Sequence, residues 1–239
     1  MEKDKILGYQ SIVLKALSGK IDDFYLAGGT ALSLFYFQHR LSIDLDFFTP
    51  NFSNKQVEDI IACLKISLKK NIKLTAQSLT DKRTKMMVYR IHFSNKDDLK
   101  IDFVEDVFPL IKQPKNIEEI KVLSLEDIYL RKIYAIVGAL PILNEIGKTN
   151  LIGGRIEAKD FYDLYFLSHT FMPLSRFAEK YGNPMIKEGL ISWFRAYDRM
   201  NMIDGVLTLE AAGKINYKSM EKHFSGEIDK IIETEVESL

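Results

Sequence analysis

Residues 24–48 read FYLAGGTALSLFYFQHRLSIDLDFF, and this stretch decides the fold. Residues 24–27 are apolar and predict a short buried strand that ends at Gly28-Gly29. Residues 31–38 predict a short, very apolar helix, and residues 43–48 predict a second strand. The order strand, glycine turn, helix, strand indicates a mixed α/β core around this segment.

Gly28, Gly29 and Thr30 join the first strand to the helix. Glycine allows a tight turn and close approach of a ligand, and the start of a helix offers unpaired N–H groups to a phosphate. Thr30 is expected to cap the helix and to offer its hydroxyl to a phosphate oxygen. Taken alone, Gly-Gly-Thr usually marks an ordinary turn.

Asp44 and Asp46 are separated by one residue on the second predicted strand. Side chains two apart on a strand share a face, so both carboxylates are expected to point the same way. Two negative charges this close favour a bound cation between them. Carboxylate oxygens are the ligands that Mg²⁺ takes in proteins, and Mn²⁺ suits the same oxygen-rich site.

Asp102 is the third carboxylate of interest, between the apolar residues Ile101 and Phe103 on a strand predicted over 99–104. An adjacent strand would bring it beside Asp44 and Asp46, and three carboxylates can hold two metal ions. Separately, each feature has an ordinary explanation as a turn, a solvated Asp-x-Asp pair or a surface residue. Their combination in this order favours a metal site.

The rest of the chain divides into two halves of different character. The first half carries further helical patterns and strands, and the strands over 86–93 and 99–104 are expected to form a hairpin. Ser124 opens a helix predicted to run to Leu140, where Pro141 stops it, and only helical patterns follow. The predictions at this level are helices over 6–17, 55–70, 124–140, 156–168, 185–199 and 217–236, and strands over 72–79, 86–93 and 99–104. We therefore predict an α+β core over residues 1–120 and an all-helical part over 121–239.

Composition limits the class of protein. The 239 residues include 33 basic and 33 acidic side chains, so a nucleic-acid partner is neither inferred nor excluded from the net charge, and any basic surface must be local. The single cysteine, Cys63, is expected in the core and fits a reducing cytoplasm. No apolar run approaches the ~20 residues that span a bilayer, so we expect neither a signal peptide nor a membrane segment.

Residues 26–32, Leu-Ala-Gly-Gly-Thr-Ala-Leu, followed by Arg40, Ser42 and the Asp44-Leu45-Asp46-Phe-Phe strand, resemble the core motif of AbiEii/AbiGii-type nucleotidyltransferase toxins. The MenT toxins are similar, and all belong to the DNA polymerase β-like nucleotidyltransferase superfamily. The resemblance implies a small mixed sheet flanked by helices, with a helical C-terminal part that closes a nucleotide cleft. It also implies that Gly28, Gly29, Thr30, Arg40 and Ser42 contact the nucleotide.

The resemblance continues to about residue 170. The family has a helical lysine and a later basic-Asp-x-x-Asp segment, which map here to Lys132 and to Lys159-Asp160-Phe-Tyr-Asp163. It implies that Lys132 neutralises the triphosphate and that Asp160 or Asp163 orients Lys132 or contacts the nucleotide. A solvated helix lysine and aspartates favoured near a helix start give the same pattern. Arg155 is a further candidate phosphate contact, or part of a glycine linker.

The function implied is a Mg²⁺- or Mn²⁺-dependent transfer of a nucleoside monophosphate from an NTP to an acceptor hydroxyl, with release of pyrophosphate. Asp44, Asp46 and Asp102 would bind the metals and, with Lys132, form the catalytic set. The family further implies a tRNA acceptor and a cognate antitoxin. The basic stretch Lys82–Lys85 is either a solvated loop, which its composition favours, or an RNA contact. The alternatives are a small-molecule or protein acceptor, or a nucleotide-binding module without catalysis.

Overall fold

The computed structural model describes residues 2–80, 84–94, 96–143, 145, 147 and 149–237. The chain forms two compact units. The first comprises Met1–Tyr36 and Leu41–Ser124, and the second comprises Phe37–Arg40 and Leu125–Leu239. Compared with the predicted ranges 1–120 and 121–239, the division falls after Ser124, and four residues of the first half belong to the second unit.

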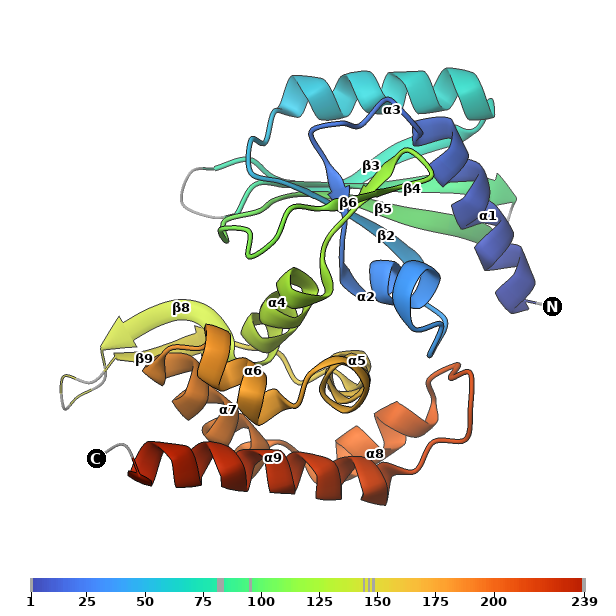
Figure 1. The fold of residues 1–239 in the computed structure, drawn as a ribbon. Coiled ribbons are helices and arrows are strands. Elements are labelled where there is room, and N and C mark those ends of the chain that lie inside the picture. Colours follow the sequence, from blue (N-terminus) through green and yellow to red (C-terminus); the bar gives the residue numbers. More distant parts are fainter. Residues whose placement is uncertain are drawn as a thin grey trace. The chain divides into compact units, whose positions relative to one another are not determined.

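The first unit is built on a seven-stranded mixed sheet in the order β3-β4-β5-β2-β1-β7-β6 (Figure 1). Its two parallel pairs are β2–β5 and β1–β7, and its other neighbours are antiparallel. The strands are β1 (Tyr25–Leu26), β2 (Asp44–Thr49), β3 (Asn71–Ser78), β4 (Met86–Ser94), β5 (Asp97–Glu105), β6 (Lys115–Ile117) and β7 (Ile120–Val122).

Helices cover this sheet, with α3 lying along one face and α2 on the side away from it (Figure 1). On β2 and β5, buried Leu45, Phe47, Ile101 and Phe103 alternate with more polar residues, which gives the sheet one apolar face and one polar face. The helical segments of this unit are α1 (Glu2–Leu17), α2 (Gly28–Ala31), the π-helical turn η1 (Leu32–Tyr36) and α3 (Asn54–Leu68).

The predicted α+β class and the predicted hairpin are confirmed, because β4 pairs with β5 along its length. Strands β6 and β7 were not predicted, since three residues each carry no readable periodicity. The predicted helix over 31–38 begins three residues earlier and ends in the π-helical turn. Cys63 was wrongly assigned to the core: its side chain is exposed, because α3 buries Ile60, Ile61 and Leu64 on its other side.

The second unit is mainly helical and contains one two-stranded sheet, β8 (Gly138–Leu143) paired with β9 (Thr149–Gly153). Aromatic side chains fill its core, with Phe161 contacting Trp193 and Phe224. Its helical segments are α4 (Leu125–Val137), α5 (Ala158–Phe166), the π-helical turn η2 (Leu167–Phe171), α6 (Leu174–Tyr181), α7 (Pro184–Ala196), α8 (Arg199–Leu207) and α9 (Tyr217–Glu237).

The prediction of an all-helical C-terminal part was therefore wrong in one place. Helix α4 ends at Val137 rather than Leu140, and Pro141 lies within β8 instead of stopping a helix. Proline is tolerated there because a two-stranded ribbon leaves edge positions where no ladder donor is needed. Gly138 has a positive φ of 94° and a backbone so close to Ile152 that no side chain fits, which ends the helix and begins the hairpin.

No helix among the residues that the structure describes is both long and apolar enough to cross a membrane.

Candidate active site

The carboxylates singled out in the sequence meet on neighbouring strands of the first unit. Asp44 and Asp46 lie on β2 and Asp102 lies on β5, where Asp46 and Asp102 are direct register partners. Leu45 between the two β2 aspartates is fully buried on the other face. The period of two along β2 and the parallel pairing with β5 thus place all three carboxylates on one face of the sheet.

Lys100 completes this group and was not singled out from the sequence. It is the register partner of Asp44, and its Nζ lies 2.6 Å from Asp102 Oδ2 and 3.8 Å from Asp44 Oδ2. Burial lowers the pKa of Lys100, but the hydrogen bond with Asp102 and the charges of the three aspartates outweigh burial and raise it. The ammonium group is therefore a cation held among the carboxylates.

Asp102 is the most buried of the three carboxylates. Burial raises the pKa of its carboxyl group, and the hydrogen bond and positive charge of Lys100 oppose that rise only in part. Its Oδ1 atom is buried and has no hydrogen-bond partner in the described part of the chain. A buried oxygen without a hydrogen-bond partner costs free energy unless it binds a ligand. Asp102 Oδ1 is therefore suited to coordinate a metal ion.

The side chains as placed do not form a closed metal centre. Within the described ranges, no group of three or more His, Cys, Asp or Glu side chains is close enough to hold a metal ion. The ammonium group of Lys100 takes up Asp102 Oδ2. The donor set, the shared face and the unpartnered oxygen of Asp102 nevertheless fit a hard divalent cation such as Mg²⁺.

Gly28 lies directly against this carboxylate group. Its φ is +67°, and a Cβ atom added to it would lie 2.6 Å from Asp46 Oδ2. Ala27, the residue before it, donates its backbone N–H to the main-chain oxygen of Asp46 at 2.9 Å. Only glycine permits both the positive φ and this close approach, so the glycine turn is fitted to β2.

Thr30 does not cap α2, which corrects the sequence-based expectation. The N-cap residue is Ala27, and Thr30 is the third residue of the helix, fully buried. Its hydroxyl hydrogen-bonds the main-chain oxygen of Asp44 and lies 2.8 Å from the Ser42 hydroxyl. Buried Gln10 of α1 donates to the main-chain oxygen of Ser42 at 2.7 Å. Thr30 and Gln10 thus fix the start of the strand that carries Asp44.

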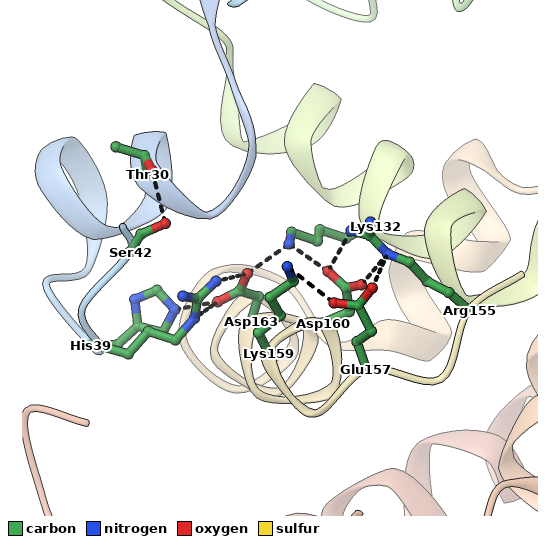
Figure 2. Close-up of polar contacts among 10 residues, drawn as sticks. Thr30, His39, Ser42, Lys132, Arg155, Glu157, Lys159, Asp160 and Asp163 are labelled. Carbon is green, nitrogen blue, oxygen red and sulfur yellow. Dashed lines mark hydrogen bonds and ion pairs between the residues drawn. The ribbon is translucent and has the colours of Figure 1, made fainter. Parts of the chain in front are cut away.

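The second unit holds the other group of residues expected at the site (Figure 2). Lys132 of α4 lies between Asp160 and Asp163 of α5, with its Nζ 2.7 Å from a carboxylate oxygen of each. All three side chains are buried, so Lys132 is not a solvated helix lysine. The spacing of three residues places both aspartates on the same face of α5.

Two residues of the segment Phe37–Arg40 join this network. Arg40 binds Asp163 through two hydrogen bonds of 2.7 Å, and His39 Nε2 lies 2.7 Å from Asp163 Oδ1. Burial alone would raise the pKa of the Asp163 carboxyl, but Lys132, Arg40 and the His39 hydrogen bond hold it well below its usual value. Asp163 is therefore an ionised carboxylate at the centre of a buried charge network.

Arg155 extends the network at its edge. Its Nε lies 2.6 Å from Asp160 Oδ2, and half of its side chain is exposed. Burial raises the pKa of Asp160, while Lys132 and Arg155 together bring it below its usual value. The buried cations and anions thus neutralise one another within the second unit.

The site residues expected from the sequence fall into two groups. The structure brings Gly28, Ser42, Asp44, Asp46 and Asp102 together in the first unit. It brings Arg40, Lys132, Asp160 and Asp163 together in the second. His39, Lys100 and Gln10 were missed; the Lys-x-Asp spacing of Lys100 and Asp102 on one strand was the signal for Lys100. Lys82 and Arg83 lie outside the described residues.

Comparison with known proteins gives consistent matches. Residues 12–238 match the family described as nucleotidyl transferase AbiEii toxin, type IV toxin–antitoxin system. Protein aq_aa25 of Aquifex aeolicus is 32% identical over 149 residues, which are 62% of this chain and 59% of that protein, so the match spans about three fifths of the relative.

The fold is shared with solved structures, two of which are described here. JHP933 from Helicobacter pylori has a TM-score of 0.61 at 18% identity, covering 100% of this chain and 96% of its own. MenT4, a nucleotidyltransferase toxin from Mycobacterium tuberculosis, has a TM-score of 0.61 at 14% identity, covering 96% of this chain and 84% of its own.

Proposed function

Because this chain belongs to the AbiEii family of nucleotidyltransferase toxins, we propose that it transfers a nucleoside monophosphate from an NTP to an acceptor hydroxyl and releases pyrophosphate. The observation that carries the proposal is the alignment of Asp44, Asp46 and Asp102 on one face of β2 and β5. In that reaction the protein provides positioning and neutralisation of charge, for which a carboxylate-bound cation is suited.

We assign the metal ligands to these three carboxylates. Mg²⁺ or Mn²⁺ bound there would neutralise the charge of the triphosphate and of the leaving pyrophosphate. Asp102, with its buried and unpartnered Oδ1, would help to activate the acceptor hydroxyl. Gln10 and Thr30 act as positioning residues, since they hold the main chain on either side of Ile43 at the start of β2.

For the nucleotide, we propose contacts from the main chain of Gly28 and Gly29 and from the Ser42 hydroxyl. Thr30 is fully buried, so its part is to orient Ser42. Arg40, Lys132, Asp160 and Asp163 were expected at the nucleotide as well. Their mutual ion pairs favour a structural role in the second unit, and the stability experiment in the Discussion separates the two roles.

The acceptor that we propose is an RNA hydroxyl, with the 3′ end of tRNA as the first candidate. This proposal rests on the resemblance to the AbiEii and MenT toxins. The family also supports a cognate antitoxin as a partner, and we place the activity in the cytoplasm, where NTPs and tRNA are available.

The direct test is to incubate the protein with each labelled NTP in turn, Mg²⁺ and total RNA. We expect label on RNA and release of pyrophosphate, both abolished by EDTA. Label found only on protein or on a small metabolite would support the transferase activity and refute the proposal of an RNA acceptor. Absence of label transfer to any acceptor with every NTP would refute the enzymatic proposal.

A second prediction concerns Lys100. Its ammonium occupies Asp102 Oδ2, so a divalent cation at Asp102 has to displace it. Lys100→Met keeps most of the side-chain volume and removes the charge. We expect it to tighten Mn²⁺ binding to the NTP-free protein by roughly tenfold, equivalent to about 1.4 kcal/mol, in a calorimetric titration.

Lys65→Met is the matched control, because Lys65 is exposed on α3 and away from the carboxylates. It should leave the Mn²⁺ affinity unchanged. An affinity for Mn²⁺ that is unchanged or weaker in Lys100→Met would show that Lys100 does not compete with the metal.

A further inference from the structure

A row of basic residues crosses the sheet of the first unit and ends at Asp44. Lys73 on β3 is the register partner of Arg90 on β4, Arg90 is the partner of Lys100 on β5, and Lys100 is the partner of Asp44 on β2. Register partners on neighbouring strands point to the same face. Since strands lie about 4.8 Å apart, the three cations span roughly 10 Å and lead toward the carboxylates.

Apart from Lys100, the cations of this row have no ion-pair partner in the described part of the chain. Lys73 and Arg90 are exposed, and neither forms a side-chain hydrogen bond or an ion pair with any residue that the structure describes. Among the three, Lys100 is neutralised, by Asp102. By contrast, the next row on the same face pairs His92 with Asp98, opposite charges when the histidine is protonated.

Like charges directly opposite one another on neighbouring strands destabilise a sheet. Lys73 opposite Arg90 therefore costs stability, and neither exposed side chain gains burial in return. An anionic ligand that lies across the strands would remove this repulsion. The direction of the row is also informative, because it ends where the proposed acceptor hydroxyl has to be placed.

We propose that Lys73, Arg90 and Lys100 form a phosphate-binding track that guides the single-stranded end of an RNA acceptor to Asp44. The inference rests on the proposed function, whose acceptor it would position. A phosphodiester chain carries one negative charge per nucleotide, so its phosphates can follow a single row of cations. Its terminal hydroxyl would then lie at the carboxylates. The track residues contact phosphates, so they contribute affinity and not sequence preference.

The test uses the full chain and a 5′-fluorescein-labelled single-stranded RNA of about twelve nucleotides, within the usual range of single-strand binding sites. The variant is Lys73→Gln/Arg90→Gln. The control is Lys55→Gln/Lys65→Gln, which removes two exposed positive charges on α3. Fluorescence anisotropy is measured over a series of NaCl concentrations without NTP, and the affinity for Mg-NTP is measured separately.

We expect the track variant to bind RNA roughly tenfold more weakly at physiological salt. The slope of log affinity against log salt should fall by about 1.4, or about 0.7 for each lost phosphate contact. The affinity for NTP and the control variant should be unchanged. Equal RNA affinity and slope in the track variant and wild type would overturn the proposal, as would an equal loss in the control.

Three further outcomes separate this proposal from others. If polyglutamate displaces the RNA at equal charge concentration, the row binds polyanions in general and the assignment to RNA is wrong. If the track variant loses RNA binding while wild type transfers no label from NTP, the RNA-binding role of the track is supported and the proposed transferase activity is refuted. If the track variant fully retains RNA labelling at limiting RNA concentration, the track proposal is refuted and the proposed transferase activity is not affected.

Discussion

Replacing Asp44 or Asp46 with asparagine is expected to lower kcat for nucleotidyl transfer at least about a thousandfold, equivalent to ~4 kcal/mol of transition-state stabilisation. Asparagine keeps the size of the side chain but removes the charge that binds a cation. Both residues are only half-buried on β2, so the fold should tolerate the change. Label transfer from NTP to acceptor is the measurement, with thermal unfolding as the test of the fold.

Asp98→Asn is the matched control, because Asp98 lies on the same face of β5 and outside the carboxylate group. It should change kcat less than about twofold. Asp102→Asn should slow the chemical step more than it weakens NTP binding. Transfer within about tenfold of wild type in both Asp44→Asn and Asp46→Asn would rule out these residues as metal ligands, since ~1.4 kcal/mol corresponds to one decade.

Asp163→Asn is expected to destabilise the second unit by about 3–5 kcal/mol, because it leaves Arg40 and Lys132 buried without their shared carboxylate. That is a large part of the ~5–15 kcal/mol that stabilises a typical domain. Trp193 on α7 is the single tryptophan of the chain and reports on this unit. Urea unfolding followed by its fluorescence gives the free energy of unfolding directly.

Asp229→Asn serves as the control, because Asp229 is exposed on α9. It should change stability by less than about 0.5 kcal/mol. If Asp163→Asn instead leaves the unfolding curve unchanged and weakens NTP binding, Asp163 is a nucleotide ligand. The assignment of a structural role to it is then refuted. Lys132→Met can be judged by the same two measurements.

The pH dependence of stability provides an independent check on Asp163. The folded-state pKa of its carboxyl is depressed, so its stabilising contribution is complete above the unfolded-state value of ~3.9 and is lost as pH falls toward the folded-state value. Wild type should lose stability steeply below about pH 4. Asp163→Asn should lack that part of the acid dependence. Parallel pH curves for the two proteins would contradict the depressed pKa.

Local patterns in the sequence predicted the parts of the site that depend on local geometry. The alternation in Asp44-Leu45-Asp46 fixes a shared strand face, and the Asp160-x-x-Asp163 spacing fixes a shared helix face. Both follow from the period of the backbone alone. Asp102 was expected beside Asp44 and Asp46 on an adjacent strand. That placement depends on a tertiary contact, which the structure gives as the parallel pairing of β2 and β5.

Long-range pairing explains what the sequence could not predict. The capture of Asp102 by Lys100 depends on side-chain placement across strands, and the ion pair of Arg40 with Asp163 joins residues 123 apart in the chain. His39 gave no signal, because its partner on α5 has no fixed spacing from it. The hairpin β8–β9 was missed because its apolar run around Pro141 continues the pattern of the preceding helix.

The four-residue segment Phe37–Arg40 bears on how this protein can be divided. Because it lies within the first half of the chain and belongs to the second unit, a cut after Ser124 yields a C-terminal fragment that lacks Arg40 and His39. Such a fragment retains Asp163 and Lys132 but loses the bidentate partner of that carboxylate. Residues 125–239 expressed alone should therefore form a destabilised unit, whereas insertions in a surface loop of either unit leave the segment Phe37–Arg40 in place.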